Sequence, residues 1–249
     1  MPKLNDNLEE HGLPSGSFGY SGARLDDLGA TEYTLVDLVV DVSSSVSSFK
    51  SEMEKCLQQI IQACKMSPRA DNLMLRLIVF ADDLHEIHGY KLLENCNLGD
   101  YDNLLKTGGC TALFDASENS IMAQTDYAKK LSDSDFQVNG IAFFLTDGED
   151  NRSKCTESDV GKAISEAMRT EALESLVTVL IGVGTKAYAT VSASLDRFKQ
   201  GANLTQFVEV GSASAKTLAK LAEFVSKSIS SQSQSLGTGG ASTPVSLNI

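Results

Sequence analysis

Short apolar runs that alternate with segments of helical periodicity constrain this chain more than any other feature of its sequence. The runs lie at residues 35–40, 73–80, 141–145, 176–183 and 206–210. Apolar residues recur at helical spacing in residues 46–64, 113–131, 157–170, 188–199 and 214–229. Because the runs lack internal polar alternation, we expect strands that are buried on both faces. The sequence therefore predicts a doubly wound, Rossmann-like α/β fold, with a mostly parallel sheet of about five or six strands and helices on both faces.

The two ends of the chain differ in composition from the region between them. Residues 1–30 are polar and rich in glycine, and we expect them to form an arm that packs on or beside the domain. Residues 31–230 contain the predicted strands and helices and are expected to form one domain. Residues 231–249 carry no charged side chain and are dense in serine and glycine, which predicts a flexible tail.

The composition argues against several classes of function. Lysine and arginine number 21 against 33 aspartate and glutamate, so the net charge is −12, and we expect no nucleic-acid partner because such a surface repels phosphate. No apolar run approaches the ~20 residues that cross a bilayer, and the polar start lacks a signal-peptide core, so we expect a cytoplasmic protein without a membrane partner. The five cysteines form no CxxC pair, which argues against a zinc site or a disulfide framework.

Oxygen-bearing side chains occur in three loops that follow predicted strands or precede predicted helices. Ligands of such sheets bind outside the carboxyl ends of the strands, so these loops are where a site is expected. Asp41, Ser43 and Ser45 follow the first apolar run in the motif DVSSS. Thr111 follows a glycine pair in TGGCTAL, and Asp147 follows a strand in LTDG. Taken one at a time, each motif also has an ordinary structural explanation as a helix cap or a turn.

Taken together, the three loops supply two carboxylates and three hydroxyls. These are hard oxygen donors, and they suit Mg²⁺, with Mn²⁺ and Ca²⁺ as alternatives. Two carboxylates leave a divalent ion nearly neutral, so that it can accept a further carboxylate from outside. Helix N-termini beside the site would also favour an incoming anion. No pair of nucleophile and base accompanies the set, and we therefore do not expect an enzyme.

These motifs resemble the metal-ion-dependent adhesion site (MIDAS) of the von Willebrand factor A (VWA) family. The family pattern is DxSxS, then a threonine after a glycine pair, then an aspartate after a later strand, and this chain has DVSSS, GGCTAL and LTDG in that order. The resemblance covers roughly residues 34–229, and the preceding stretch LDDLGATEYTL is similar to that of single-domain bacterial and phage-type members. Ser44 and Val46 depart from the glycine and methionine that are frequent in the family, but neither change removes a ligand. The resemblance implies metal ligands, some acting through water, at five positions: Asp41, Ser43, Ser45, Thr111 and Asp147.

The resemblance implies a divalent-metal-dependent protein-binding module, in which an aspartate or glutamate of a partner protein completes the coordination of the metal. Stand-alone members of the family often act with AAA+ ATPases of the MoxR type or in stress and defence modules, which implies an adaptor role. Two alternatives stay open: a Mg²⁺-dependent phosphohydrolase, and a structural module whose site holds no metal. A phosphatase of the haloacid dehalogenase type needs a second aspartate two residues after the first, where this chain has Ser43.

Other charged or titratable residues have simpler interpretations. His85 and His88 lie in HEIHGYKLL, which is expected to form an edge strand, and we interpret both as surface residues. Glu149 and Asp150 are expected to form an acidic rim or to cap the helix that follows them. Asp37 is a charged residue inside the first apolar run, and the sequence does not identify its partner.

Overall fold

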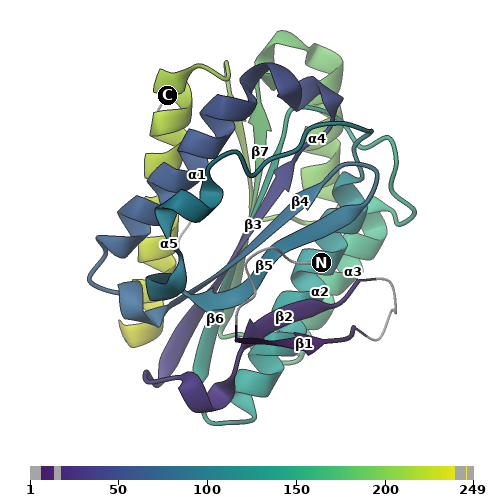
Figure 1. Ribbon diagram of the computed structural model, residues 1–249. Helices are drawn as coiled ribbons and strands as arrows, with labels where there is room; N and C mark the ends of the chain where they lie inside the picture. The colour runs from purple at the N-terminus through teal and green to yellow at the C-terminus, as the bar shows by residue number, and fades with distance from the viewer. Residues whose placement is uncertain (1–6, 14–17, 239–244, 246–249) are drawn as a thin grey trace.

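A computed structural model describes residues 7–13, 18–238 and 245 of the chain (Figure 1). Within these residues, eight strands form a sheet in the order β1-β2-β5-β4-β3-β6-β7-β8. The strands are β1 Leu8–His11, β2 Tyr20–Ala23, β3 Glu32–Asp41, β4 Leu73–Phe80, β5 Leu84–Leu92, β6 Gln137–Thr146, β7 Ser175–Val183 and β8 Gln206–Val210. The longer helices are α1 Lys50–Lys65, α2 Leu113–Ser132, α3 Glu157–Arg169, α4 Ala189–Gly201 and α5 Ala215–Thr238.

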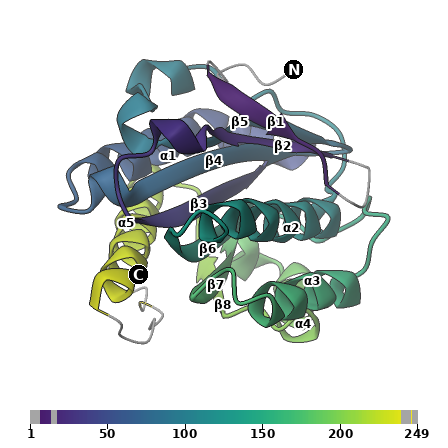
Figure 2. The same ribbon diagram turned by 90° about the horizontal axis from the view of Figure 1, so that it is seen from below.

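The strands at the centre of the sheet run parallel to one another. β3 pairs in parallel with β4 and β6, and β7 continues the parallel set between β6 and β8. Helices α1 and α5 cover one face of the sheet, while α2, α3 and α4 cover the other (Figure 2). The predicted doubly wound α/β fold is therefore confirmed, although the sheet has more strands than the five or six expected. None of the helices in the described part of the chain combines the length and the apolar character that a membrane span needs.

The central strands are buried along almost their whole length, which explains the apolar runs in the sequence. Every residue of β4 is buried, and so are the last nine residues of both β3 and β6. Val40 of β3 pairs with Leu145 of β6, so that Asp41 and Thr146 occupy the next positions on two neighbouring parallel strands. The DVSSS loop and the LTDG loop therefore leave the sheet side by side, at the same edge.

The N-terminal arm extends the sheet. β1 pairs with β2 in antiparallel fashion, and β2 joins β5 in parallel at Gly22 and Tyr90. The expectation that HEIHGYKLL forms an edge strand is therefore wrong, because β2 lies beyond β5. The approach is close: a Cβ atom on Gly89 would overlap the backbone carbonyl of Ser21. Glycine at this position lets the two strands pair.

Helix α5 extends beyond residue 230, where the composition predicted the end of the domain. Residues 231–238, which were expected in a flexible tail, continue α5. The Gln232 side chain is buried and donates from Nε2 to Ser175 Oγ at 2.7 Å, while Asn139 Nδ2 donates to the Gln232 carbonyl at 3.0 Å. Polar partners at the start of β6 and β7 thus stabilise a helical turn that hydrophobicity alone does not predict. Residues 239–244 and 246–249 lie outside the described part of the chain.

A buried group of charges joins the arm to the sheet. Arg76 of β4 is 1% exposed, and its Nε donates to Glu86 Oε2 at 2.6 Å. Its Nη1 lies 3.5 Å from Asp37 Oδ2, which identifies the partner of the charge inside β3. Glu86 Oε1 accepts hydrogen bonds from both the backbone N–H (3.0 Å) and the hydroxyl (2.6 Å) of Ser21. The arm therefore contributes to satisfying charges that the sheet buries.

His88 also differs from its predicted surface position, since it is fully buried in β5. Its Nε2 lies 2.9 Å from Tyr101 Oη and its Nδ1 lies 3.0 Å from the Gly89 carbonyl oxygen. The carbonyl requires a proton on Nδ1, so Nε2 of the neutral ring accepts from the tyrosine. Desolvation, reinforced by the positive charge of Lys91, lowers the pKa of His88 to about 3.

We expect His88 to make the native state less stable as the pH falls below about 6.5, the pKa of histidine in an unfolded chain. Between this pH and about 3, the unfolded state binds a proton on His88 that the native state does not. The difference in free energy of unfolding between wild type and His88→Gln should thus shrink between pH 7.5 and 5 in urea titrations. His85→Gln, at an exposed position, is the control and should leave the pH dependence unchanged. An identical pH dependence in His88→Gln and wild type would contradict the assignment.

Candidate metal centre

The three loops identified in the sequence meet at the edge of the sheet where β3 and β6 end. Asp41 is the last residue of β3, and Ser43 and Ser45 lie in the turn that leads into α1. Asp147 directly follows β6, and Thr111 precedes the start of α2 by two residues. Residues far apart in the chain are thus brought to one place because neighbouring parallel strands end at the same edge.

A chain of hydrogen bonds connects four of the five side chains. The Ser43 backbone N–H donates to Asp41 Oδ1 at 2.7 Å, and the hydroxyl oxygens of Ser43 and Ser45 lie 3.1 Å apart. Ser45 Oγ then donates to Asp147 Oδ1 at 2.8 Å. Asp41 and Ser43 are 1% and 2% exposed, whereas Ser45 is exposed. The group therefore has a buried base and an outer side that is open to solvent.

Thr111 lies beside this chain. Its side-chain Oγ1 is 3.9 Å from the position that a Cβ atom on Gly148 would occupy, and Gly148 is the neighbour of Asp147. Thr111 is also fixed by Asn151, whose Oδ1 accepts from the Thr111 N–H at 2.9 Å and whose N–H donates to the Thr111 carbonyl at 3.0 Å. The structure thus connects four of the five predicted residues by hydrogen bonds and places the Thr111 hydroxyl beside the neighbour of Asp147, with Asn151 as an unpredicted support.

The glycine pair positions the Thr111 loop against the DVSSS loop. Gly108 N–H donates to the Val42 carbonyl at 2.8 Å, and Ser44 N–H donates to the Gly109 carbonyl at 3.2 Å. Gly109 has a φ of +85°, and a Cβ atom there would lie 2.5 Å from Asp82 Oδ2. Glycine is therefore required at position 109 by both its backbone conformation and the nearby carboxylate.

Thr146 is a residue of the site that the sequence analysis missed. It is 1% exposed, and its hydroxyl donates to Asp41 Oδ2 at 2.6 Å. Both oxygens of the Asp41 carboxylate therefore accept a hydrogen bond inside the protein. The only signal in the sequence was a hydroxyl residue at the end of an apolar run, directly before Asp147.

Replacing Thr146 by valine keeps the shape of the side chain but removes the hydrogen bond to Asp41. We expect the affinity for Mg²⁺, measured by calorimetric titration, to fall about 10- to 100-fold, as is usual when a group that orients a metal ligand is lost. Thr178→Val, which changes another buried threonine of the sheet, should lower stability without changing Mg²⁺ affinity. Equal Mg²⁺ affinities in wild type and Thr146→Val would show that Thr146 does not support a metal ligand.

The two carboxylates are held in a setting that disfavours their negative charge. Burial raises the pKa of Asp41 to about 6, although hydrogen bonds from Thr146 and Ser43 oppose the shift and the charge of Asp147 adds to it. Burial also raises the pKa of Asp147, against the hydrogen bond from Ser45. A bound cation would favour the ionised form of both carboxylates. A bound cation would therefore offset the cost of keeping these two carboxylates ionised.

Two of the distances between candidate ligand oxygens are compatible with a small divalent ion. In octahedral Mg²⁺ coordination at about 2.0–2.1 Å, neighbouring ligand oxygens are about 2.9 Å apart. The distances between the Ser43 and Ser45 hydroxyls (3.1 Å) and between the Ser45 hydroxyl and Asp147 Oδ1 (2.8 Å) are close to this value. In the described residues, no group of three or more His, Cys, Asp or Glu side chains is placed to hold a metal. The candidate set is of another kind, since hydroxyls supply three of its five donors.

Asp150 has a structural role in the rim of the site. Its Oδ2 accepts from the Phe114 N–H at 3.1 Å and from the Ser153 hydroxyl. It therefore caps the start of α2, which lies earlier in the chain, and the expectation that it caps the following helix is wrong. Glu149 is exposed and remains in the rim.

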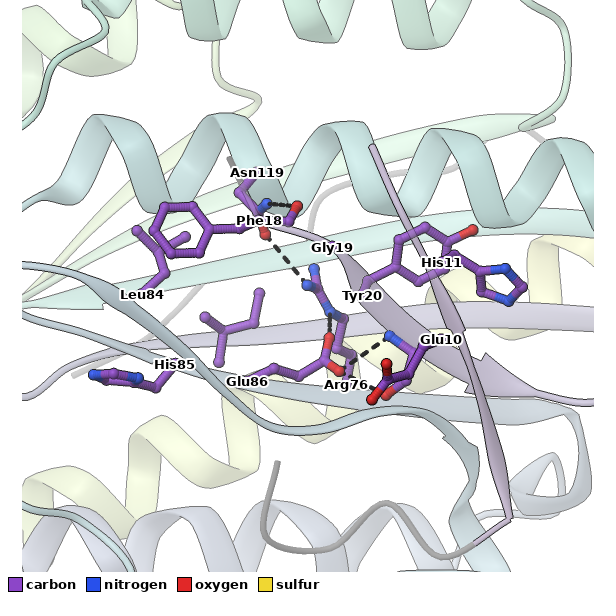
Figure 3. Close-up of a pocket in the computed structure, with 12 residues that line it drawn as sticks. Glu10, His11, Phe18, Gly19, Tyr20, Arg76, Leu84, His85, Glu86 and Asn119 are labelled. Carbon is purple, nitrogen blue, oxygen red and sulfur yellow. Dashed lines mark hydrogen bonds and ion pairs between the residues drawn. The ribbon is translucent and has the colours of Figure 1, made fainter. Parts of the chain in front are cut away.

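A cavity of about 300 Å³ lies away from these loops, between the arm and the sheet (Figure 3). His11 and Tyr20 line one side and Leu84 lines another, with Arg76 between Glu86 and Asn119 at the centre of the view. The Arg76 side chain is 1% exposed and already bound to these neighbours, with Nη2 donating to Asn119 Oδ1 at 3.2 Å. The Arg76 and Glu86 charges at the centre of this cavity are thus paired with each other, and the five-oxygen group is the stronger candidate site.

Comparison with known proteins places the chain by its fold. Neither a protein-family model nor a curated protein matches it. Among solved structures, it is similar to the PilB minor pilin from Streptococcus sanguinis, with a TM-score of 0.58, 16% identity, and coverage of 88% of this chain and 66% of that one. Proximal thread matrix protein 1 from the mussel byssus gives a TM-score of 0.54 and 21% identity, over 80% of this chain and 47% of that one. The pilus adhesin SpaC from Lactobacillus rhamnosus GG gives a TM-score of 0.59 and 9% identity, over 81% of this chain and 31% of that one.

These similarities show a shared fold. The sheet order and the two helical layers are those of a mostly parallel, doubly wound α/β fold, which is the fold class that the sequence predicted. The chain covers less than two thirds of the length of each of these three structures.

Proposed function

We propose that this chain is a protein-binding module that holds a divalent cation, with Mg²⁺ as the first choice, and takes a carboxylate from its partner. The ligands are the side chains of Asp41, Ser43, Ser45, Thr111 and Asp147. The partner is a protein that presents an aspartate or glutamate, and the resemblance to the VWA family suggests an AAA+ ATPase as one such partner. We expect no catalysis by this chain.

The observation that carries the proposal is the convergence of hydroxyl and carboxylate oxygens at distances that suit one small ion. Ser45 stands at the centre of this convergence, since its hydroxyl lies near both Ser43 and Asp147. The same hydrogen bonds also hold the side chains in place in the absence of a metal. Such preorganisation lowers the cost of binding an ion.

The protein and the metal have separate roles in this proposal. Bound Mg²⁺ supplies a positive centre that attracts an anionic ligand. The buried Asp41 anchors the base of the site through its hydrogen bonds with Ser43 and Thr146. Ser45 and Asp147 lie on the open side, where a ligand from outside would approach. The adhesin among the fold neighbours supports a role in binding.

Mg²⁺ should stabilise the folded protein, because the proposed site is formed only in the native state. A ligand that binds only the native state adds about 2.7 kcal/mol at 100 times its dissociation constant, so we expect Tm to rise with Mg²⁺ and to return to its original value with EDTA. Asp41→Ala should weaken this response strongly, whereas Asp102→Ala, at an exposed position away from the loops, should retain it. Equal Mg²⁺ responses in wild type and Asp41→Ala would refute the proposed site.

The binding role is tested with the partner itself. Immobilised protein is exposed to a lysate of the native host with Mg²⁺ or with EDTA, and we expect specific capture only with Mg²⁺. A phosphate-ester turnover assay with and without Mg²⁺ tests the competing hydrolase function. Metal-dependent turnover lost in Asp41→Ala would favour that alternative.

A further inference from the structure

An arginine lies at the rim of the proposed metal site. Arg152 follows Asn151, the residue that forms two hydrogen bonds with the backbone of Thr111. The Arg152 Nε atom lies 3.5 Å from Asp82 Oδ1, and this oxygen also accepts from the Cys110 N–H at 3.3 Å. The guanidinium group is thus held beside the residue that precedes Thr111.

Arg152 is free to change partners. Its side chain is 60% exposed and that of Asp82 is 47% exposed, so their ion pair is solvated and weak. Asp82 keeps its hydrogen bond to Cys110 when the arginine moves away. The guanidinium thus starts from a position next to Cys110, the neighbour of Thr111, and its departure leaves the hydrogen bond between Asp82 and Cys110 in place.

The loops around the site carry several negative charges, which Arg152 can offset for an incoming carboxylate. Asp82, Asp83 and Glu149 are exposed on loops at this edge of the sheet, and they repel an approaching carboxylate. A partner carboxylate that binds a metal through one oxygen leaves its second oxygen facing the surrounding protein. A guanidinium group, with its fixed fork of N–H donors, is well suited to bind that oxygen.

We propose that Arg152 selects carboxylate ligands at the metal site by leaving Asp82 and donating hydrogen bonds to the carboxylate oxygen that the metal does not bind. This inference rests on the proposed function, since it assigns the ligand class of the same site. Asp82 acts as the resting partner of Arg152 and competes with the incoming ligand. Arg152 and Asp82 therefore set the affinity for the partner in opposite directions.

Acetate is a suitable probe because it presents one carboxylate and nothing else. The protein is loaded with Mn²⁺, whose affinity is measured first, and acetate binding is followed through the paramagnetic relaxation of its methyl protons. In Arg152→Ala we expect acetate affinity to fall about three- to tenfold with Mn²⁺ affinity unchanged, as for the loss of a solvent-exposed charge-assisted hydrogen bond. In Asp82→Asn, which retains an acceptor for Cys110, acetate affinity should rise. Lys154→Ala removes an exposed charge two residues away and should change neither affinity.

The outcomes separate the two proposals. Absence of Mn²⁺ binding by the wild type would overturn the proposed function, and this inference with it. Normal Mn²⁺ binding with equal acetate affinity in wild type and Arg152→Ala would overturn this inference alone. An equal loss in Lys154→Ala would show a general charge effect, and a loss of Mn²⁺ affinity in Arg152→Ala would show a structural role. Either result would also refute the selective role of Arg152.

Discussion

Replacing Asp147 by alanine should raise the dissociation constant for Mg²⁺ by about 100-fold or more, because the substitution removes one of the two negative charges in the site. Stability without metal should change by no more than about 1.5 kcal/mol, because the half-buried Asp147 side chain loses its hydrogen bond from Ser45. Burial already raises the pKa of Asp147, so the metal-free protein gains little from its charge. Calorimetric titration with Mg²⁺ and urea unfolding in EDTA measure the two effects.

Glu149→Ala is the matched control for this experiment. It removes the same charge two residues away, from an exposed side chain, and Mg²⁺ affinity should change only slightly. Similar losses of affinity in the two variants would show that the general acidity of the edge, rather than a ligand at position 147, attracts the cation.

Mg²⁺ binding to the wild type should also depend on pH. Protons compete with a metal for carboxylate ligands, and burial raises the pKa of Asp41 to about 6 in the metal-free protein. Mg²⁺ affinity should therefore fall as the pH is lowered through about 6. An affinity that stays constant between pH 7.5 and 5 would argue against Asp41 as part of the site.

Arg76→Ala should lower the free energy of unfolding by about 3–5 kcal/mol at pH 8, because it leaves buried carboxylates without their cation. Asp37 is fully buried, and Glu86 is bound to Arg76 at 2.6 Å. Since Glu86 also accepts two hydrogen bonds from Ser21, loss of Arg76 should loosen the pairing of the arm. Urea unfolding measures the first effect, and hydrogen exchange at residues 20–23 measures the second.

The pH dependence of this loss distinguishes charge from packing. Burial raises the pKa of Asp37 to about 6 even with Arg76 present, and removal of the cation should raise it further. The variant can then take up a proton on Asp37 as the pH falls, so its deficit relative to wild type should be smaller at pH 5 than at pH 8. A constant deficit would point to lost packing alone. Arg169→Ala, in an exposed ion pair, should change stability by less than about 0.5 kcal/mol.

The candidate site residues could be grouped from the sequence because their loops adjoin strands of one parallel sheet. Strands that are buried on both faces read as unbroken apolar runs, and a parallel sheet brings the ends of those strands to one edge. This reasoning was sufficient to place Asp41 and Asp147 at the same edge. It could not detect Thr146 or Asn151, since their roles depend on hydrogen bonds across 105 and 40 residues of chain.

The sequence by itself determined the doubly wound architecture and identified the five candidate ligands, because apolar periodicity and the alternation of strands with helices are local properties of the chain. Only the tertiary structure decided that the arm adds strands to the sheet, that α5 continues beyond residue 230, and that His88 is buried. The arm and the end of α5 are rich in polar residues and carry little hydrophobic signal. Their order depends on partners distant in the chain: Glu86 for Ser21, and Ser175 for Gln232. Such polar contacts become favourable only when the surrounding fold excludes water from them.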